Sequence, residues 1–439
     1  MCAGVGKSGS PRISEASGTP AACKVRTSPR IAFTAVGRNE LTRCAIGSES
    51  ADTSGEYQSL PAPRNCRADP AETPRPFTDC HNEAVRRKSD LPTPALLLDL
   101  DLFEANLARM MDRVRASGKQ LRPHLKAHKC VEIARRQLAA GACGISVATV
   151  PEAELMAQAG IGGLLLTSPL ADPRKMARAA ATGAMVVVDH AEQVRWYGEA
   201  AAALGRTVEV LIDLDVGDHR TGARSTAQAL EIARVIAQTP GLQLRGLQGY
   251  SVLGSHAGGF AERQRVSQAA FAGVAETQAA LAEAGFETGI ITGGSTGSWE
   301  IDLALPQVTE IQAGSFVLMD LAYRREGLDF AHALTVLATV ISANHDAFVT
   351  LDAGFKAFST DRGYGPEPVA LPGYGYRWGG DEFGYLDRPA DAAAPRLGDR
   401  LEFIPPHCDP TVNLYDRIYA CRGEQVLETW PVMQRWAGA

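Results

Sequence analysis

The stretch GISVATVPEAELMAQAGIGGLLLTSPLADPRKMARAAATGAMVVVD, residues 144–189, contains the pattern that decides the fold. Three short apolar runs, at 144–149, 163–168 and 184–189, are separated by two amphipathic segments, at 151–160 and 172–182. Buried strands that alternate with helices of this length are typical of βαβ units around a parallel sheet. The stretch therefore predicts an α/β fold.

The same alternation continues on both sides of this stretch. An opening strand at 94–101 leads into a helix that ends near Gly118, and another helix is predicted at 225–239. After the opening strand we predict eight strands, at 120–123, 144–149, 163–168, 184–189, 208–215, 243–250, 288–292 and 310–313. Eight strands with helices between them are most simply arranged as a (β/α)8 TIM barrel.

The pattern changes after about His332, where the helices stop. Short strand-like runs separated by turn-rich loops follow, which indicates an antiparallel β-domain. We therefore predict a barrel at 91–335 and a C-terminal antiparallel β-domain at 336–439.

Residues 1–90 have a different composition, rich in Ser, Pro, Arg, Ala, Gly and Thr, and show no periodicity. We predict a disordered leader or an over-extended N-terminus. The opening residues are basic and contain no apolar run, which excludes a secretory signal and leaves an organelle transit peptide as the alternative.

Charge and cysteine content limit the class of protein. The net charge is −6 over 439 residues, which leaves no broad basic surface for nucleic acid. No run approaches the roughly 18 apolar residues of a membrane-spanning helix. The nine cysteines form no CxxC pair, which favours a reducing compartment and argues against a disulfide framework. We predict a cytoplasmic protein that does not bind membranes or nucleic acid.

Functional residues of TIM barrels gather at the C-terminal ends of the strands. The first barrel strand ends in RPHLKAHK, residues 122–129, which contains Lys126 and His128. Burial among the barrel walls would lower the pKa of Lys126 and make it a competent amine for a Schiff base with an aldehyde. A solvated basic loop is the alternative.

Two further strand ends supply an arginine and a tyrosine. DLDVGDHRTG, residues 213–222, places Arg220 after a turn at Gly217. A guanidinium remains charged and would hold the nitrogen of an aromatic heterocycle unprotonated, whereas the alternative is a salt bridge with Asp213, Asp215 or Asp218. Tyr250, at the end of LQGY, either contacts a bound ring or packs in the core.

The seventh barrel strand runs into ITGGSTGSWE, residues 291–300. Gly294, Ser295 and Thr296 offer backbone N–H groups and hydroxyls where the chain leaves the strand. Barrels often bind phosphate at this position. We predict a phosphate cradle.

The β-domain contains IPPHCDPTVN, residues 404–413. His407 and Asp409 are two residues apart in what we predict to be extended chain, so both side chains would point the same way and could bind one divalent ion. Two protein ligands with open positions suit a catalytic ion.

Together these motifs resemble the D-threonine aldolase and D-serine dehydratase family of pyridoxal-phosphate enzymes. The resemblance extends over nearly all of 91–439 and rests on RPHLKAHK, PEAELMAQAGI, DVGDHRTG, LQGY, GGSTGS, AGSFVLMD, DAGFKAFSTDRG and HCDPTVN. It implies the alanine racemase-type fold, a homodimer, and pyridoxal 5′-phosphate at the barrel mouth. Lys126 would then form the Schiff base with the cofactor, Arg220 would face the pyridine nitrogen, Tyr250 would lie beside the ring, and Gly294, Ser295 and Thr296 would hold the phosphate.

The resemblance also implies a metal site at His407 and Asp409, near the β-hydroxyl of the substrate. Dehydratase-type members resemble HxC, whereas aldolase-type members resemble HCD, and this chain has HCD. A carboxylate with an imidazole favours Mn²⁺ or Mg²⁺, with Zn²⁺ as the alternative. Cys408 would point to the opposite side and serve packing.

The expected activity is a metal-assisted cleavage of D-β-hydroxy-α-amino acids, D-threonine-like, to glycine and an aldehyde. His128 or a bound hydroxide would deprotonate the β-hydroxyl. The first alternative is a dehydratase of D-serine or 3-hydroxy-D-aspartate that gives an oxoacid and ammonia. Racemisation is a weaker option because it needs no metal pair, and a non-catalytic pyridoxal-phosphate-binding regulator is the alternative from another class.

Overall fold

The computed structural model describes residues 87–433 and 435. Most of the predicted leader, 1–90, therefore lies outside the described residues. Within 87–90, Lys88–Asp90 forms a short 3-10 helix, in which the Lys88 ammonium lies 2.6 Å from Glu402. Ordered structure thus begins before Leu91.

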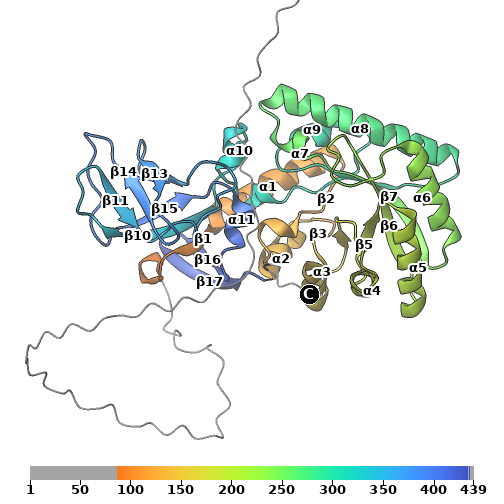
Figure 1. The fold of residues 1–439 in the computed structure, drawn as a ribbon, viewed down its shortest axis with the longest axis horizontal. Coiled ribbons are helices and arrows are strands. Elements are labelled where there is room, and N and C mark those ends of the chain that lie inside the picture. Colours follow the sequence, from red (N-terminus) through yellow and green to blue (C-terminus); the bar gives the residue numbers. More distant parts are fainter. Residues whose placement is uncertain (1–86, 434, 436–439) are drawn as a thin grey trace, which may run out of the picture. The chain divides into compact units, whose positions relative to one another are not determined.

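A sheet of eight parallel strands forms the barrel (Figure 1). Its order is β2-β9-β8-β7-β6-β5-β4-β3. Backbone hydrogen bonds close the ring between its two ends, from the Cys143 N–H to the Leu121 carbonyl (2.9 Å) and from the Ser146 N–H to the Pro123 carbonyl (3.0 Å). The eight predicted strands are confirmed as β2 (Gln120–Leu121), β3 (Ile145–Val147), β4 (Leu164–Leu166), β5 (Met185–Val188), β6 (Val208–Leu214), β7 (Leu242–Gly249), β8 (Ile290–Gly293) and β9 (Glu310–Ile311).

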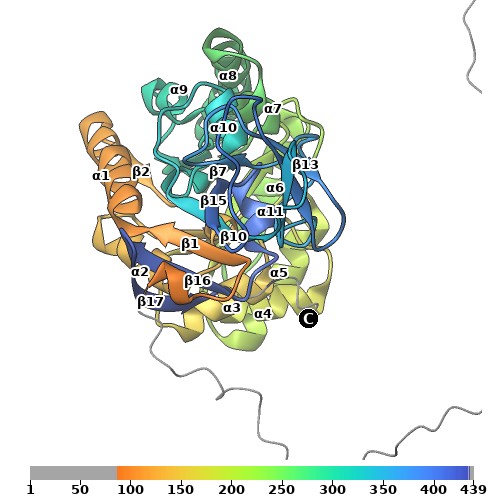
Figure 2. The ribbon, with the colours of Figure 1, turned by 90° about the vertical axis from the view of Figure 1, so that its left-hand side faces the viewer.

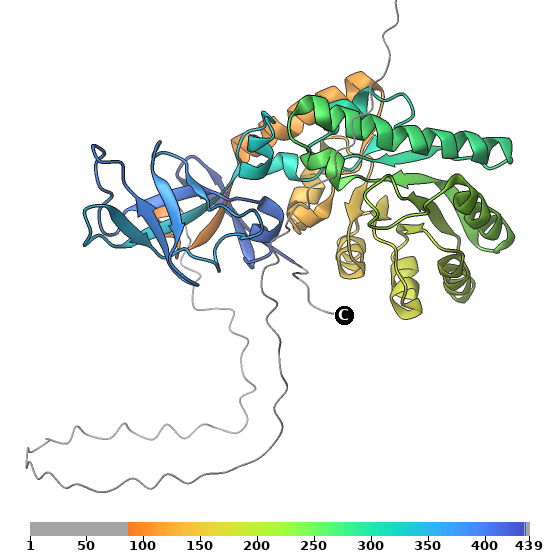
Figure 3. The ribbon, with the colours of Figure 1, turned by 45° about the horizontal axis from the view of Figure 1, so that its top comes forward.

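Helices follow the barrel strands, and α3 to α6 lie side by side outside them (Figure 3). Side-chain caps fix where several helices begin, because Thr149, Asp172 and Ser225 each accept an N–H from the first helical turn. The helices of this part of the chain are α1 (Leu100–Ser117), α2 (Val131–Ala139), α3 (Val150–Gln158), α4 (Pro173–Ala181), α5 (Ala191–Leu204), α6 (Thr226–Gln238), α7 (Val252–His256), α8 (Phe260–Glu283), α9 (Trp299–Ala304) and α10 (Leu321–Arg325). None of the described helices is long and apolar enough to span a bilayer.

The second sheet is mainly antiparallel, as predicted. It contains β1 (Ala95–Asp99), β10 (Leu334–Ser342), β11 (Phe348–Leu351), β12 (Glu367–Pro368), β13 (Gly375–Trp378), β14 (Gly384–Asp387), β15 (Arg400–Ile404), β16 (Arg417–Arg422) and β17 (Gln425–Pro431). The opening strand β1 belongs to this sheet, where it is antiparallel to β10 and parallel to β16 (Figure 2). The described part of the chain therefore has its first strand in the second sheet, then forms the barrel, and returns to the second sheet at β10. The domain boundaries 91–335 and 336–439 stay a prediction.

The expectation that helices stop after His332 is wrong at one place. A five-residue helix, α11 (Cys408–Val412), follows β15. It begins inside the predicted metal motif, which bears on the site below.

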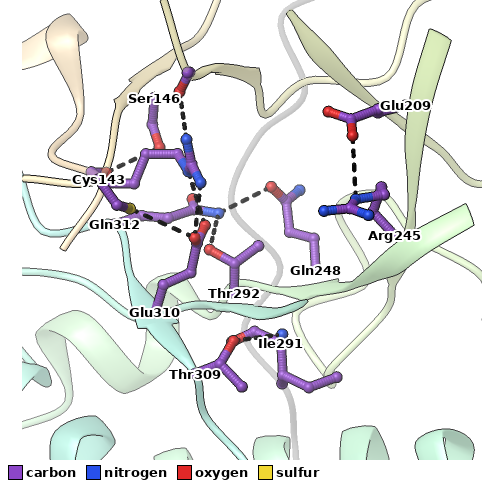
Figure 4. Close-up of polar contacts among 12 residues, drawn as sticks. Cys143, Ser146, Glu209, Arg245, Gln248, Ile291, Thr292, Thr309, Glu310 and Gln312 are labelled. Atoms are coloured by element: carbon purple, nitrogen blue, oxygen red, sulfur yellow. Dashed lines mark hydrogen bonds and ion pairs between the residues drawn. The ribbon is translucent and has the colours of Figure 1, made fainter. Parts of the chain in front are cut away.

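A buried ion pair joins the first and last strands of the barrel. The Arg122 guanidinium, one residue after β2, donates two hydrogen bonds of 2.9 Å to Glu310, the first residue of β9. Arg122 also donates to the Gly163 carbonyl. The Cys143 thiol lies 3.7 Å from the Glu310 carboxylate (Figure 4). Both charged side chains are buried, with exposed fractions of 7 % for Arg122 and 5 % for Glu310.

The ion pair supports a stability prediction. Glu310→Gln leaves the Arg122 charge buried without a counter-ion, so we expect the free energy of unfolding to fall by about 3–5 kcal/mol. Urea denaturation followed by circular dichroism measures the change. The control, Asp416→Asn, removes an exposed pair with Arg417 and should cost at most about 1 kcal/mol. Equal losses in the two variants would contradict the assignment.

Candidate active site

A cavity of about 320 Å³ lies at the C-terminal ends of the barrel strands. Three predicted site residues line it, namely Lys126, Arg220 and Tyr250. The other lining residues are His124, Ala148, Thr167, Ser168, Pro169, Thr221, Gln248 and Gln312. The structure thus brings together residues that follow β2, β6 and β7.

Lys126 lies on a 3-10 turn, Leu125–Ala127, directly after β2. Its backbone N–H donates to Nδ1 of His124 (3.3 Å), and its ammonium lies 5.7 Å from the centre of the Tyr250 ring. Burial opposes the charge, but Tyr250 and the Asp409 carboxylate outweigh burial and raise the pKa of Lys126. The expectation that the pKa of Lys126 is lowered is therefore wrong, because Tyr250 and then Asp409 favour the charged amine by more than burial disfavours it.

Arg220 and Tyr250 lie against each other on the rim of the cavity. The guanidinium carbon is 4.8 Å from the centre of the Tyr250 ring. Asp215 binds His219 (2.8 Å), and Asp218 accepts a hydrogen bond from the residue after Tyr250 (2.7 Å). Among the residues that the structure describes, Arg220 forms no ion pair with an acidic side chain, so the salt-bridge alternative is wrong.

A largely buried polar network includes three residues of the cavity wall, Thr221, Gln248 and Gln312. The Asp213 carboxylate accepts hydrogen bonds from Gln248 (2.8 Å) and Thr221 (2.8 Å). Gln312 donates to Gln248 (3.1 Å) and Thr292 (3.1 Å) (Figure 4). Burial raises the pKa of Asp213 to about 6 despite these donors. The sequence analysis did not predict this network. Single polar residues inside the apolar runs VLIDL (210–214), LQG (247–249) and IQA (311–313) could have indicated it.

The glycine-rich turn leaves the sheet beside Tyr250, because Gly249 of β7 pairs with Gly293 of β8. Residues 294–297 are all buried. Within the described part of the chain, the N–H groups of Gly294, Thr296 and Gly297 have no acceptor. Buried N–H groups need partners, so this turn fits an anionic ligand.

Close packing requires glycine at two positions of this turn. Gly294 has φ +72°, and a Cβ there would lie 2.4 Å from the Asp302 carboxylate. A Cβ at Gly297 would lie 1.9 Å from the Ser255 carbonyl oxygen. The Thr296 hydroxyl oxygen accepts the Phe316 N–H (3.1 Å), which leaves its proton available for a ligand.

The structure places the HCD motif differently from the prediction. His407 is extended, with φ −146°, but α11 begins at Cys408 and Asp409 lies in its first turn. The prediction that the pair lies on one face of an extended chain is therefore wrong. Cys408 does not point away either, because its fully buried thiol donates to the Asp409 carboxylate (3.2 Å). Burial and the charges of Asp320 and Asp409 raise the pKa of Cys408 well above its ordinary value, so the thiol stays protonated.

His407 and Asp409 are each held by a neighbour. Nδ1 of His407 lies 2.8 Å from the Asp361 carboxylate, which leaves Nε2 for a ligand. Asp409 accepts a hydrogen bond from Ser315 (2.9 Å). Burial opposes its ionisation, but the charges of Lys126 and His407 lower the pKa of Asp409 to about 2.

This donor set fits a metal with open positions. A metal-bound histidine usually has its other ring nitrogen on a carboxylate, as His407 has on Asp361. No group of three or more His, Cys, Asp or Glu side chains in the described part of the chain is arranged to hold an ion by itself. Substrate or water would have to complete the coordination of an ion at His407 and Asp409.

His128 is fully buried and does not line the cavity. Its Nδ1 accepts the Cys130 N–H (3.2 Å), and burial lowers its pKa to about 4. The structure thus gives His128 a place in the core behind Lys126.

His256 is a histidine that the sequence analysis missed. It ends α7, and its ring stacks on that of Tyr323 with 5.1 Å between centres. Burial and the nearby charges of Arg362, His407 and Lys126 lower the pKa of His256 to about 4, so it is neutral at pH 7. His256 lies six residues after Tyr250, in the same connection between β7 and α8, and this position could have indicated a site residue.

Two family models match the chain. "Alanine racemase, N-terminal domain" covers residues 98–321, and "Putative serine dehydratase domain" covers residues 333–421. The first match spans the barrel and the second spans most of the second sheet.

Characterised relatives match over most of their length. The chain is 38 % identical over 351 residues to a D-threonine aldolase of Arthrobacter sp., with 78 % of this chain and 92 % of the relative covered. It is 33 % identical to a 3-hydroxy-D-aspartate aldolase of Paracoccus denitrificans (80 % and 94 % covered) and 32 % identical to a D-threo-3-hydroxyaspartate dehydratase of Delftia sp. (79 % and 98 %). The crystal structure of D-threonine aldolase from Filomicrobium marinum superposes with TM-score 0.78 at 36 % identity, covering 81 % of this chain and 98 % of that one.

The burial of His128 supports a prediction on pH. Its pKa is depressed from 6.5 to about 4 in the folded chain, so the unfolded chain binds more protons between these values and stability falls as the pH is lowered through this window. Between pH 7 and pH 5 this group should cost about 2 kcal/mol of stability. His128→Asn, which keeps an acceptor for the Cys130 N–H, should remove that part of the pH dependence of urea unfolding. The exposed His345→Asn should leave the pH dependence unchanged, and an unchanged slope in His128→Asn would disprove the explanation.

Proposed function

This chain belongs to the family of proteins that join an alanine racemase N-terminal domain to a serine dehydratase domain, and from that membership we propose that it is a pyridoxal 5′-phosphate- and divalent-metal-dependent aldolase. The reaction would cleave D-configured β-hydroxy-α-amino acids such as D-threonine to glycine and an aldehyde. The observation that carries the proposal is the packing of α11, which contains Asp409, against the 3-10 turn that contains Lys126, since it places a candidate metal-binding carboxylate near the candidate reactive amine. The charges of Lys126 and Asp409 interact accordingly.

The cofactor would be held by residues whose chemistry suits its parts. Lys126 would bind its aldehyde carbon and Tyr250 would lie against its ring, since both line the cavity. The turn of Gly294, Ser295 and Thr296 does not line this cavity but leaves the sheet beside Tyr250, and it would bind the phosphate through the N–H groups of Gly294 and Thr296. When bound, pyridoxal 5′-phosphate supplies a conjugated system that accepts electrons from the substrate α-carbon. Arg220 stays charged at working pH and would keep the ring nitrogen unprotonated.

The metal would be held by His407 and Asp409. An ionised carboxylate together with an imidazole suits Mn²⁺ or Mg²⁺, whereas thiolate ligands suit softer ions. Zn²⁺ is the alternative. When bound, such an ion acts as a Lewis acid that makes a hydroxyl group easier to deprotonate. Asp361 orients the His407 ring and Ser315 orients the Asp409 carboxylate.

A base must accept the β-hydroxyl proton. His128, the predicted candidate, lies outside the cavity with one ring nitrogen occupied. His256 does not line the cavity either, but its neutral imidazole interacts with the charges of Lys126, His407 and Asp409, whereas His128 interacts only with Asp409 among these three groups. We therefore assign the proton to His256, with Tyr323 holding the ring by stacking.

Dehydration is the second candidate function, and the 32 % identical Delftia dehydratase favours it. In that reaction Lys126 would remove the α-proton, the hydroxyl group would leave as water, and hydrolysis of the resulting imine would give an oxoacid and ammonia. The carboxylate of Asp409, where dehydratase-type members resemble HxC, favours the aldolase. The homodimer and the cytoplasmic location expected from the sequence remain predictions, although symmetric dimers are the commonest oligomers.

Product analysis tests the function. Purified protein with pyridoxal 5′-phosphate is incubated with D-threonine, D-serine and D-3-hydroxyaspartate, with and without Mn²⁺. We expect glycine and aldehyde from D-threonine, stimulated by Mn²⁺, and no such stimulation in His407→Ala. Oxoacid and ammonia as the only products would favour the dehydratase, and cofactor binding without turnover would favour the regulator.

Lys126→Ala tests the assignment of the amine. The variant should lose the visible absorption band of the cofactor–lysine Schiff base, because no other amine lines the cavity as described. Absorption spectra of the purified variants measure this. Lys356→Ala, which changes an exposed lysine of the second domain, should keep the wild-type band. A wild-type band in Lys126→Ala would refute the assignment.

A further inference from the structure

A chain of buried hydroxyl groups lies behind the phosphate cradle and ends on a buried carboxylate. Asp302, on α9, has no exposed surface. One of its carboxylate oxygens accepts a hydrogen bond from Ser267, and the other accepts one from Ser298. The mechanism proposed above assigns no role to these three residues.

The chain connects Asp302 to the cradle itself. Ser298 Oγ accepts the Ser295 N–H (3.2 Å) and lies 3.1 Å from Ser295 Oγ. Ser295 Oγ in turn donates to Ser255 Oγ (2.8 Å). The Asp302 carboxylate also packs directly behind Gly294, since a Cβ on that glycine would lie 2.4 Å from it.

The direction of these hydrogen bonds follows from counting protons. A serine hydroxyl has one proton, and Ser298 gives its proton to Asp302. The Ser298 oxygen is then restricted to accepting, and it accepts from the backbone of Ser295. The carboxylate therefore fixes the orientation of Ser298, and Ser298 fixes the turn.

Burial of a carboxylate costs free energy, so a buried carboxylate needs hydrogen-bond donors around it, as Asp302 has in Ser267 and Ser298. Burial raises the pKa of Asp302 to about 6, against the hydrogen bonds from Ser267 and Ser298, so the group is still ionised at pH 7.5. An ionised acceptor binds hydroxyl donors about twice as strongly as a neutral one.

We propose that Asp302 is a positioning residue for the cofactor phosphate, acting through Ser298 to hold the Gly294–Gly297 turn with its free N–H groups toward the ligand. The inference rests on the proposed function, because it presumes that this turn binds the phosphate of pyridoxal 5′-phosphate. Asp302 itself does not contact the ligand.

The test compares two ligands that differ only in the phosphate. Full-length wild-type protein, freed of cofactor, is titrated with pyridoxal 5′-phosphate and with pyridoxal, and binding is followed by absorption. In Asp302→Asn and Ser298→Ala we expect the affinity for pyridoxal 5′-phosphate to fall by about 10-fold or more, the scale of a lost hydrogen bond to a charged group. The affinity for pyridoxal should change by less than about 2-fold.

A matched control and a folding check accompany the titration. Thr335→Val removes another hydroxyl-to-carboxylate hydrogen bond, to Glu402 (2.8 Å) in the second sheet, and should leave both affinities unchanged. Urea unfolding reports whether the variants fold. If Asp302→Asn does not fold, Ser298→Ala carries the same comparison with the carboxylate in place.

The outcomes separate this inference from the proposed function. Equal losses for the two ligands, or no loss for either, would overturn the role of Asp302 while leaving the cofactor assignment intact. Failure of the wild-type chain to bind pyridoxal 5′-phosphate would overturn the proposed function itself.

Discussion

The candidate site depends on the closure of the parallel barrel between β2 and β3. The hydrogen bonds from Cys143 and Ser146 to the segment after β2 complete the ring, and the buried Arg122–Glu310 pair fastens β2 to β9 on its other side. An open sheet would leave β2 and β3 at opposite edges. Closure instead brings Lys126 to one cavity with residues at or after the ends of β3, β4, β6, β7 and β9.

Residues that follow the last barrel strand, β9, hold the proposed metal-binding segment of the second domain in place. Ser315, shortly after β9, donates to the Asp409 carboxylate (2.9 Å), and Asp320 accepts the Cys408 N–H (2.8 Å). These hydrogen bonds fix the first turn of α11 above the end of β2. Hydrogen bonds from the segment after the barrel therefore help to position the proposed metal ligands, although these ligands follow a strand of the second sheet, β15.

The sequence predicted the parts of the fold that local periodicity determines. The eight barrel strands and the meeting of Lys126, Arg220 and Tyr250 followed from strand ends in a closed ring. Pairing partners are not encoded locally, so the membership of β1 in the second sheet was not predictable from its own residues. The pKa of Lys126 was predicted in the wrong direction for the same reason, because Tyr250 and Asp409, which raise it, both lie far away in sequence.

The start of α11 also determines the chemical character of the proposed metal site. His407 is followed by a thiol and then a carboxylate, and an extended chain would have separated these two on opposite faces. Because α11 begins at Cys408, the thiol is instead buried and donates to Asp409, which remains an ionised oxygen donor. Oxygen donors prefer harder ions than thiolates do. An ion at His407 and Asp409 would therefore meet an imidazole nitrogen and an ionised oxygen, with the neighbouring thiol kept protonated. The carboxylate at position 409, where dehydratase-type members resemble HxC, is thus the feature that favours the aldolase.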